Sequence, residues 1–225
     1  VRSSAASDVY KRQIMEFDII YPENKADAFD AECVIAAVFF DEDELRTFGV
    51  KSDSLELDDA FYNYNQFEKA FKLWSSPQYL SDFYNQFKTY FQTEYWRDIS
   101  ETTFLTEVSR SLNKIRKTII DAMENNTFHE LIKPLDAAEE EKRIYESIRV
   151  KLKQGTIIGH YPFRFYAIEV EEKKCYLITG ATIKVHKDMK KADNTDIELT
   201  KLEHALKYIN YNDIDTKDTF VTHAL

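Results

Sequence analysis

The chain has 225 residues, of which 44% are hydrophobic and 31% are charged, a balance typical of one compact domain with a packed core. Its longest apolar run, Cys33–Phe40, is far shorter than the about 20 residues that a membrane-spanning helix needs. Two cysteines are too few for a disulfide framework or a structural zinc site. We therefore expect a reduced, cytoplasmic protein that has no metal, no cofactor and no contact with a membrane.

The net charge of −10 is unevenly distributed along the chain. Residues 1–141 carry a net −13, residues 142–191 a net +7, and residues 192–225 a net −4. An acidic chain repels nucleic acid, whereas a local basic stretch attracts it. The alternative is that the basic stretch only balances acidic helices within the fold.

The first residues do not resemble a natural protein segment. Residues 3–13 read SSAASDVYKRQ, which matches the translation of the DNA adapter used in transposase-based sequencing libraries. We therefore expect residues 1–13 to be an adapter-derived tail that is not native, and residues 14–225 to form a single domain. We expect the native sequence to begin at Met15 or at an earlier start that is missing from this sequence.

The first half of the chain predicts two strands followed by a helical block. Alternation predicts a strand at 17–21, and the β-branched and aromatic run predicts a buried strand at 33–40. A helix is expected near 58–74, and Ser76 followed by Pro77 begins a second one. Ser100 caps a third helix, in which apolar residues recur every three or four positions until Asn125.

The second half changes to an alternating pattern. Strands are expected at 147–153, 163–170 and 175–185, the last two joined by the charged turn 171–174. A helix at 196–210 follows. This order predicts an α+β fold with a mainly antiparallel sheet and a three-strand meander near its carboxyl end.

The sequence lacks the signatures of common enzymes, and its candidate functional surface is a set of basic residues on the meander strands. The histidines lack metal-ligand spacing, and Cys175 is expected in the core. The three meander strands carry cations that can converge on one surface; these and their polar neighbours are Arg149, Lys151, Lys153, Arg164, Tyr166, Lys184, His186 and Lys187. Metal-free RNA cleavage requires such a set, because a base, an acid and cations must surround one phosphate. Any exposed antiparallel strand can also alternate basic and apolar residues.

The residues from Lys133-Pro134-Leu135 onward resemble the RelE/HigB-like toxin superfamily, especially its phage-derived HigB-like branch. The matching pieces are Ile148-Arg149-Val150, the strand Phe163–Ile168, the strand Tyr176–Lys184 and the helix Glu198–Tyr208 with its E-x-x-K-x-E pattern. The resemblance implies a RelE-like fold, in which a helical hairpin packs on the sheet and a helix ends the chain. The extra helices and strand at the amino end would elaborate this fold.

The resemblance also implies a function. It implies the toxin of a type II toxin–antitoxin system, a metal-independent endoribonuclease that cleaves mRNA on the ribosome or free of it. Partners would be an antitoxin and mRNA, with no DNA binding by the chain alone. The implied catalytic set is Arg149, Arg164, Lys184 and His186, and the implied RNA-binding set is Lys151, Lys153, Tyr166 and Lys187.

The chain also departs from that family, which leaves other functions open. It is more than twice the usual toxin length, and its amino-terminal half is acidic where such toxins are basic. One alternative is a non-catalytic interaction protein of a mobile element that keeps the RelE-like fold and binds a co-encoded partner. Another is a scaffold whose acidic helices bind a basic partner.

Overall fold

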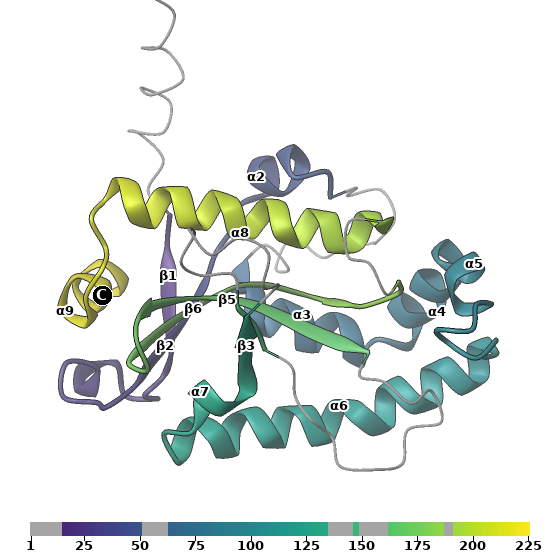
Figure 1. The fold of residues 1–225 in the computed structure, drawn as a ribbon, viewed down its shortest axis with the longest axis horizontal. Helices are drawn as coiled ribbons and strands as arrows, with labels where there is room; N and C mark the ends of the chain where they lie inside the picture. Colours follow the sequence, from purple (N-terminus) through teal and green to yellow (C-terminus); the bar gives the residue numbers. More distant parts are fainter. Residues whose placement is uncertain (1–14, 51–62, 135–145, 149–161, 187–190) are drawn as a thin grey trace, which may run out of the picture.

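The computed structural model describes residues 15–50, 63–134, 146–148, 162–186 and 191–225. The strands are β1 (Phe17–Tyr21), β2 (Val34–Val38), β3 (Ile132–Pro134), β4 (Glu146–Ile148), β5 (Phe163–Glu171) and β6 (Cys175–Ile183). The helices are the short 3₁₀ helix η1 (Lys25–Asp27), α2 (Glu42–Thr47), α3 (Gln66–Ser75), α4 (Pro77–Gln86), α5 (Lys88–Phe91), α6 (Glu101–Glu124), α7 (Phe128–Leu131), α8 (Asp193–Tyr211) and α9 (Lys217–Ala224). Figure 1 shows their arrangement.

One sheet collects all of these strands in the order β1-β2-β6-β5-β4-β3. Neighbouring strands are antiparallel except for β2 and β6, which run parallel. The long helical segment between β2 and the later strands makes this parallel pairing possible, because a tight hairpin allows only antiparallel neighbours. The α+β prediction is therefore confirmed, the sheet is mixed, and β3 adds a fourth antiparallel strand to the expected meander.

Helices cover both faces of the sheet. In Figure 1, α8 runs along one face, whereas α3 and α6 lie on the other. These layers explain why all five residues of β2 are buried, since a strand covered on both faces needs apolar side chains in both directions. This arrangement is more extensive than one helical hairpin laid across a sheet.

The predicted helix starts at Ser76 and Ser100 are confirmed. Ser76 accepts a hydrogen bond from the backbone N–H of Tyr79 and begins α4, with Pro77 in its first turn. Ser100 accepts from the N–H of Thr103 and begins α6. The helix expected near 58–74 corresponds to α3, which Asn65 caps, and residues 51–62 lie outside the described part of the chain.

Several short elements escaped the sequence reasoning, among them two helices and one strand. Helix α2 lies in the acidic run, where Asp41 and Glu44 form a reciprocal capping box. Helix α9 begins at Thr216 with a similar box, and β3 has only three residues. These elements are too short to show a hydrophobic period, so only the two helices carried a sequence signal, their capping residues.

Each face of the sheet has its own core. Beneath the sheet, Trp74 of α3 packs against Phe163 and Phe165 of β5, with ring centroids 4.4 Å and 5.3 Å apart. On the other face, Leu202 and Ala205 of α8 pack on the sheet. Residues of β5 and β6 alternate between these two cores, as the pleat of a strand requires.

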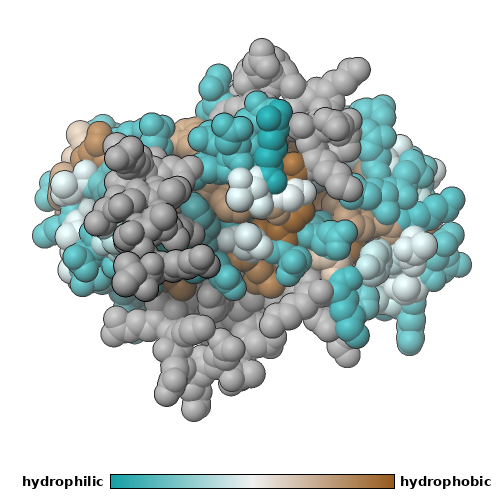
Figure 2. Space-filling model, turned by 90° about the horizontal axis from the view of Figure 1, so that it is seen from above, coloured by the Kyte–Doolittle hydropathy of each residue, from teal (hydrophilic) through white to brown (hydrophobic). Residues whose placement is uncertain are grey.

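The surface on the α8 side is largely polar. Figure 2 views the molecule from this side, where hydrophilic residues surround a patch of hydrophobic ones near the middle of the view. Within the described ranges, no helix is both long enough and apolar enough to cross a bilayer.

Candidate functional site

Two of the predicted catalytic residues lie together where β5 begins and β6 ends. Arg164 lies directly opposite Thr182 in the antiparallel register, so both side chains are on the same face. The N–H of Lys184 donates to the carbonyl of Pro162 at 2.7 Å, which extends the pairing to the next residues. Lys184 follows Thr182 by two positions and therefore emerges on the face of Arg164.

This shared face is the one that α8 covers. Tyr166, two residues after Arg164, belongs to the core beneath α8. The side chain of Asn194, in the first turn of α8, donates to Thr182 Oγ1 at 2.9 Å and to the carbonyl of Ile183 at 2.7 Å. Arg164 and Lys184 therefore lie beside the start of α8, and we call this region the β5–β6 end.

Arg164 and His186 each make a specific contact with a neighbouring residue. Arg164 is half-buried, and its Nη1 donates to the carbonyl of Phe163 at 2.8 Å. The ring of His186 meets the ring of Tyr90 of α5 edge-on, with centroids 5.8 Å apart. Trp96 Nε1 donates to the carbonyl of Val185 at 3.0 Å. The chain after β6 is therefore held against the α5 region, where His186 follows Lys184 by two positions.

The other predicted residues have different outcomes. Tyr166 is fully buried, so its ring cannot stack on a base and its expected role in RNA binding does not fit the structure. Phe165 and Tyr166 point to opposite faces of β5, and each face has its own core. The sequence interpretation assumed that one face of this strand is exposed, and it therefore placed Tyr166 at the surface. The remaining members of the predicted set, Arg149, Lys151, Lys153 and Lys187, lie outside the described residues.

A second group of polar residues, which the sequence reasoning missed, lies at the edge of β6. It consists of Gln66 and Lys69 from α3 and of Glu198 and Lys201 from α8, each no more than 6% exposed. Lys201 Nζ lies 2.7 Å from Glu198 Oε1 and donates to Gln66 Oε1 at 3.2 Å. We call these four residues the buried charge junction.

The course of β2 creates the space for this junction. Along β6, the pairing with β2 ends at Ile178, opposite Ala37. Beyond that point α3 packs against β6, and Lys69 Nζ donates to the carbonyl of Phe40 at 3.3 Å after β2 has turned away. Side chains from α8 and α3 therefore meet around the edge of β6.

Gly180 of β6 is the backbone feature that admits the junction. A Cβ atom at this position would lie 1.7 Å from Glu198 Oε2, which is far inside van der Waals contact. A glycine inside a strand often marks such a close approach. This glycine, together with the E-x-x-K spacing of Glu198 and Lys201, was the available sequence signal for the junction.

Burial shifts the proton affinities in the junction. Burial raises the pKa of the Glu198 carboxyl, and the neighbouring Lys201 ammonium partly offsets this rise. Burial also lowers the pKa of Lys69 to about 8, with a further lowering from Lys201. These shifts indicate that the protein interior disfavours each isolated charge, so the junction depends on its pairing.

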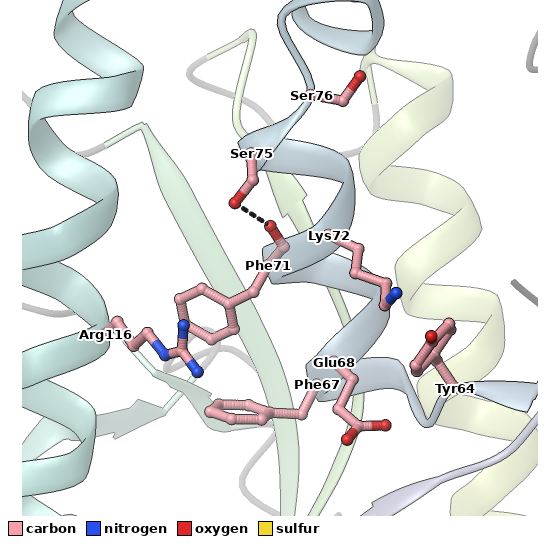
Figure 3. A pocket seen from close by; sticks show the side chains of 8 residues that line it. All are labelled: Tyr64, Phe67, Glu68, Phe71, Lys72, Ser75, Ser76 and Arg116. Atoms are coloured by element: carbon pink, nitrogen blue, oxygen red, sulfur yellow. Dashed lines mark hydrogen bonds between the residues drawn. The ribbon is translucent and has the colours of Figure 1, made fainter.

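An open groove runs across α3 and reaches α6 on the other side of the sheet; Figure 3 shows the side chains that line it. Its volume is about 480 Å³. Lys72 Nζ lies 3.7 Å from the centroid of the Tyr64 ring, and the Arg116 guanidinium lies 5.7 Å from that of Phe71. The residues that line this α3–α6 groove are Tyr64, Phe67, Glu68, Phe71, Lys72, Ser75, Ser76 and Arg116.

The cysteines have a structural role. Both Cys33 and Cys175 are buried, which confirms the core position predicted for Cys175. Burial raises the pKa of each thiol to about 12. A thiol that stays protonated is a poor nucleophile, so neither residue is suited to covalent catalysis at neutral pH.

The described part of the chain contains no group of three His, Cys, Asp or Glu side chains arranged to hold a metal ion. No protein-family model, curated protein or solved structure matches the chain. Function is therefore inferred from the β5–β6 end and the α3–α6 groove.

Proposed function

We propose that the chain binds RNA at the β5–β6 end and cleaves it without a metal ion, as the toxin of a type II toxin–antitoxin pair. The observation that supports this most is the position of Arg164 and Lys184 on one face beside the start of α8. The net +7 of residues 142–191 concentrates positive charge in the segment that contains both residues. The RelE-like character of the fold is part of this proposal.

The proposed reaction is attack by a ribose 2′-oxygen on the adjacent phosphorus. The 2′-hydroxyl loses its proton to a base, the new P–O2′ bond forms, and the P–O5′ bond breaks as the 5′-oxygen gains a proton. The products are a 2′,3′-cyclic phosphate and a 5′-hydroxyl. Arg164 and Lys184 would bind the phosphate oxygens, and the His186 imidazole would transfer a proton.

The test combines growth and RNA chemistry. Induced expression in a bacterial host should arrest growth, and co-expression of a small neighbouring antitoxin should relieve the arrest. The purified protein should cleave RNA in the presence of a metal chelator and leave 2′,3′-cyclic phosphate ends. Loss of either cation removes phosphate stabilisation, so Arg164→Gln and Lys184→Gln should each slow cleavage by about a hundredfold.

A matched control keeps this test specific. Lys207→Gln removes an exposed lysine near the carboxyl end of α8 and should leave cleavage unchanged. All variants should first show the wild-type circular dichroism spectrum and unfolding midpoint. Unchanged cleavage by folded Arg164→Gln and Lys184→Gln proteins would contradict the assignment of the β5–β6 end.

A specific observation also favours a second function, that of a non-catalytic interaction protein from a mobile element. Tyr166 is buried and the His186 ring packs against Tyr90, so the described face offers cations for binding more readily than groups for proton transfer. This function predicts a stable complex with a co-encoded protein, with neither growth arrest nor RNA cleavage. Co-purification of the two proteins, followed by the cleavage assay, distinguishes the functions.

A further inference from the structure

We infer that the α3–α6 groove is a separate binding site for nucleotides, in which an aromatic base stacks and each of two cations binds a phosphate. The groove lies on the face of the sheet opposite the β5–β6 end, because Phe67 and Phe71 pack against Phe165 while Arg164 emerges on the α8 side. The inference therefore does not depend on RNA cleavage.

The size and lining of the groove fit this class of ligand. Small-molecule sites usually have volumes of roughly 300–1,000 Å³, and the groove has about 480 Å³. Tyr64 and Phe67 are only partly buried, so their rings remain within reach of a ligand. Flat aromatic rings of this kind stack on any nucleobase, and stacking contributes about 1–3 kcal/mol per base in single-strand binding proteins.

The two cations of the groove supply charge that the described protein does not neutralise. Among the described residues, neither Lys72 nor Arg116 forms an ion pair with a carboxylate. Both lie over aromatic rings instead, as Figure 3 shows for Arg116 and Phe71. Figure 3 shows Arg116 on one side of α3 and Lys72 on the other, so each cation would bind a separate phosphate of a bound strand, Arg116 with its guanidinium fork and Lys72 with its ammonium. Glu68 also lines the groove, and its carboxylate would repel a phosphate, so the phosphates would lie at the cations and away from Glu68.

The surface of α6 continues this positive charge beyond the groove. The segment 110–117 has four basic residues and no acidic one, in a chain whose net charge is −10. Lys114 and Lys117 are exposed beside Arg116 on the same helix. A strand whose nucleotide occupies the groove could therefore extend its next phosphates along α6, so single-stranded RNA fits better than a neutral aromatic compound.

The experiment measures binding of a fluorescent twelve-residue oligoadenylate RNA by anisotropy, and binding of AMP by calorimetry. Arg116→Gln and Lys72→Gln keep much of each side chain's bulk and remove its charge, and each should weaken binding of the RNA about tenfold. Each should also reduce the slope of log affinity against log salt by about 0.7, the value for one lost phosphate contact on a single strand. Lys207→Gln is the control and should change neither quantity.

Each outcome of these binding measurements supports or overturns the proposed nucleotide site. Binding of AMP with an affinity near that of the RNA identifies a mononucleotide site, and binding of the RNA alone identifies a strand site; both support the inference when Arg116→Gln weakens them. Absence of binding to both probes, or equal binding by the wild type and both groove variants, would overturn it. A phosphopeptide that binds the groove while the two nucleotide probes do not would overturn it in favour of a protein ligand. Retained RNA binding in Arg164→Gln, with cleavage lost, would separate this site from the β5–β6 end.

Discussion

The two faces of the sheet are stabilised by different kinds of contact. On the face covered by α3 and α6, aromatic rings interlock in the core, and the buried carboxylate of Glu107 on α6 pairs with the exposed Arg110. On the α8 side, an apolar core is bordered by the buried charge junction at the edge of β6. Apolar contacts gain free energy from burial in many geometries, whereas a buried ion pair is favourable only in one. The aromatic face therefore contributes stability, and the junction specifies how α8 and α3 meet.

The largest effect is expected on the aromatic face. Trp74 is 1% exposed and contacts rings from both α3 and β5. Trp74→Ala should lower the free energy of unfolding by about 3–5 kcal/mol, because it leaves a large apolar cavity. Chemical denaturation measures this change. Tyr211→Ala, at an exposed position on α8, is the control and should stay within about 0.5 kcal/mol. A loss below about 1 kcal/mol for Trp74→Ala would contradict this account of the core.

The second largest loss of stability is expected when the buried charge junction is disrupted. Lys201→Met removes the cation that neutralises Glu198, so Glu198 must stay charged in the interior or take up a proton. Protonating a carboxyl costs about 1.4 kcal/mol for each pH unit above its pKa. Because Glu198 can always take up a proton, this cost limits the loss in the free energy of unfolding to about 3 kcal/mol at pH 7. Urea unfolding of both proteins at pH 7 measures it.

The pH dependence of the same variant gives an independent measure. Burial raises the pKa of Glu198 above its ordinary 4.5, and loss of Lys201 should raise it further. The folded variant then keeps a proton that the unfolded chain has released, so its stability should fall as the pH rises above about 4.5 and recover as the pH is lowered. Glu198→Gln combined with Lys201→Met should abolish this dependence. A variant whose stability rose with pH in this window would show that the junction is not the source.

A smaller effect is expected at Gly180. The Cβ of Gly180→Ala would overlap Glu198 Oε2, and overpacking of this kind costs about 1–3 kcal/mol. The cost should be less in a Glu198→Ala background, where the overlapping atoms are gone. A double-mutant cycle measures the difference, and strictly additive losses would mean that the two residues do not meet.

Features that depend on residues close together in the sequence were predicted, whereas features that depend on distant residues were missed. Capping residues and helical periods act within a few positions, so the starts of α4 and α6 were found at Ser76 and Ser100. Alternation likewise located β5 and β6, but it does not reveal which face another element covers. Tyr166 was therefore expected at the surface, although α8 buries it.

The parallel pairing of β2 with β6 and the buried charge junction depend on contacts between distant segments. Gln66 and Lys201 are 135 positions apart and meet only because the pairing of β2 with β6 ends at Ala37. Nothing near either residue in the sequence signals its partner. The side of the fold where each strand cation emerges has the same origin, so the candidate site could be foreseen in composition but not in geometry.

The smallest effect compares the starts of the long helices on the two faces. Ser100 accepts from the N–H of Thr103 at the start of α6, whereas α8 begins at Ala192 without a side-chain cap. Ser100→Ala should therefore lower the free energy of unfolding by about 1 kcal/mol, because it leaves a helix donor without its partner. Ser109→Ala makes the same chemical change at an exposed position within α6, where alanine is the better helix former, and should be neutral or stabilise by a few tenths of a kcal/mol. Thermal unfolding of the two variants in parallel separates capping from helix propensity, and equal effects would mean that the Ser100 hydroxyl does not stabilise the helix that borders the groove.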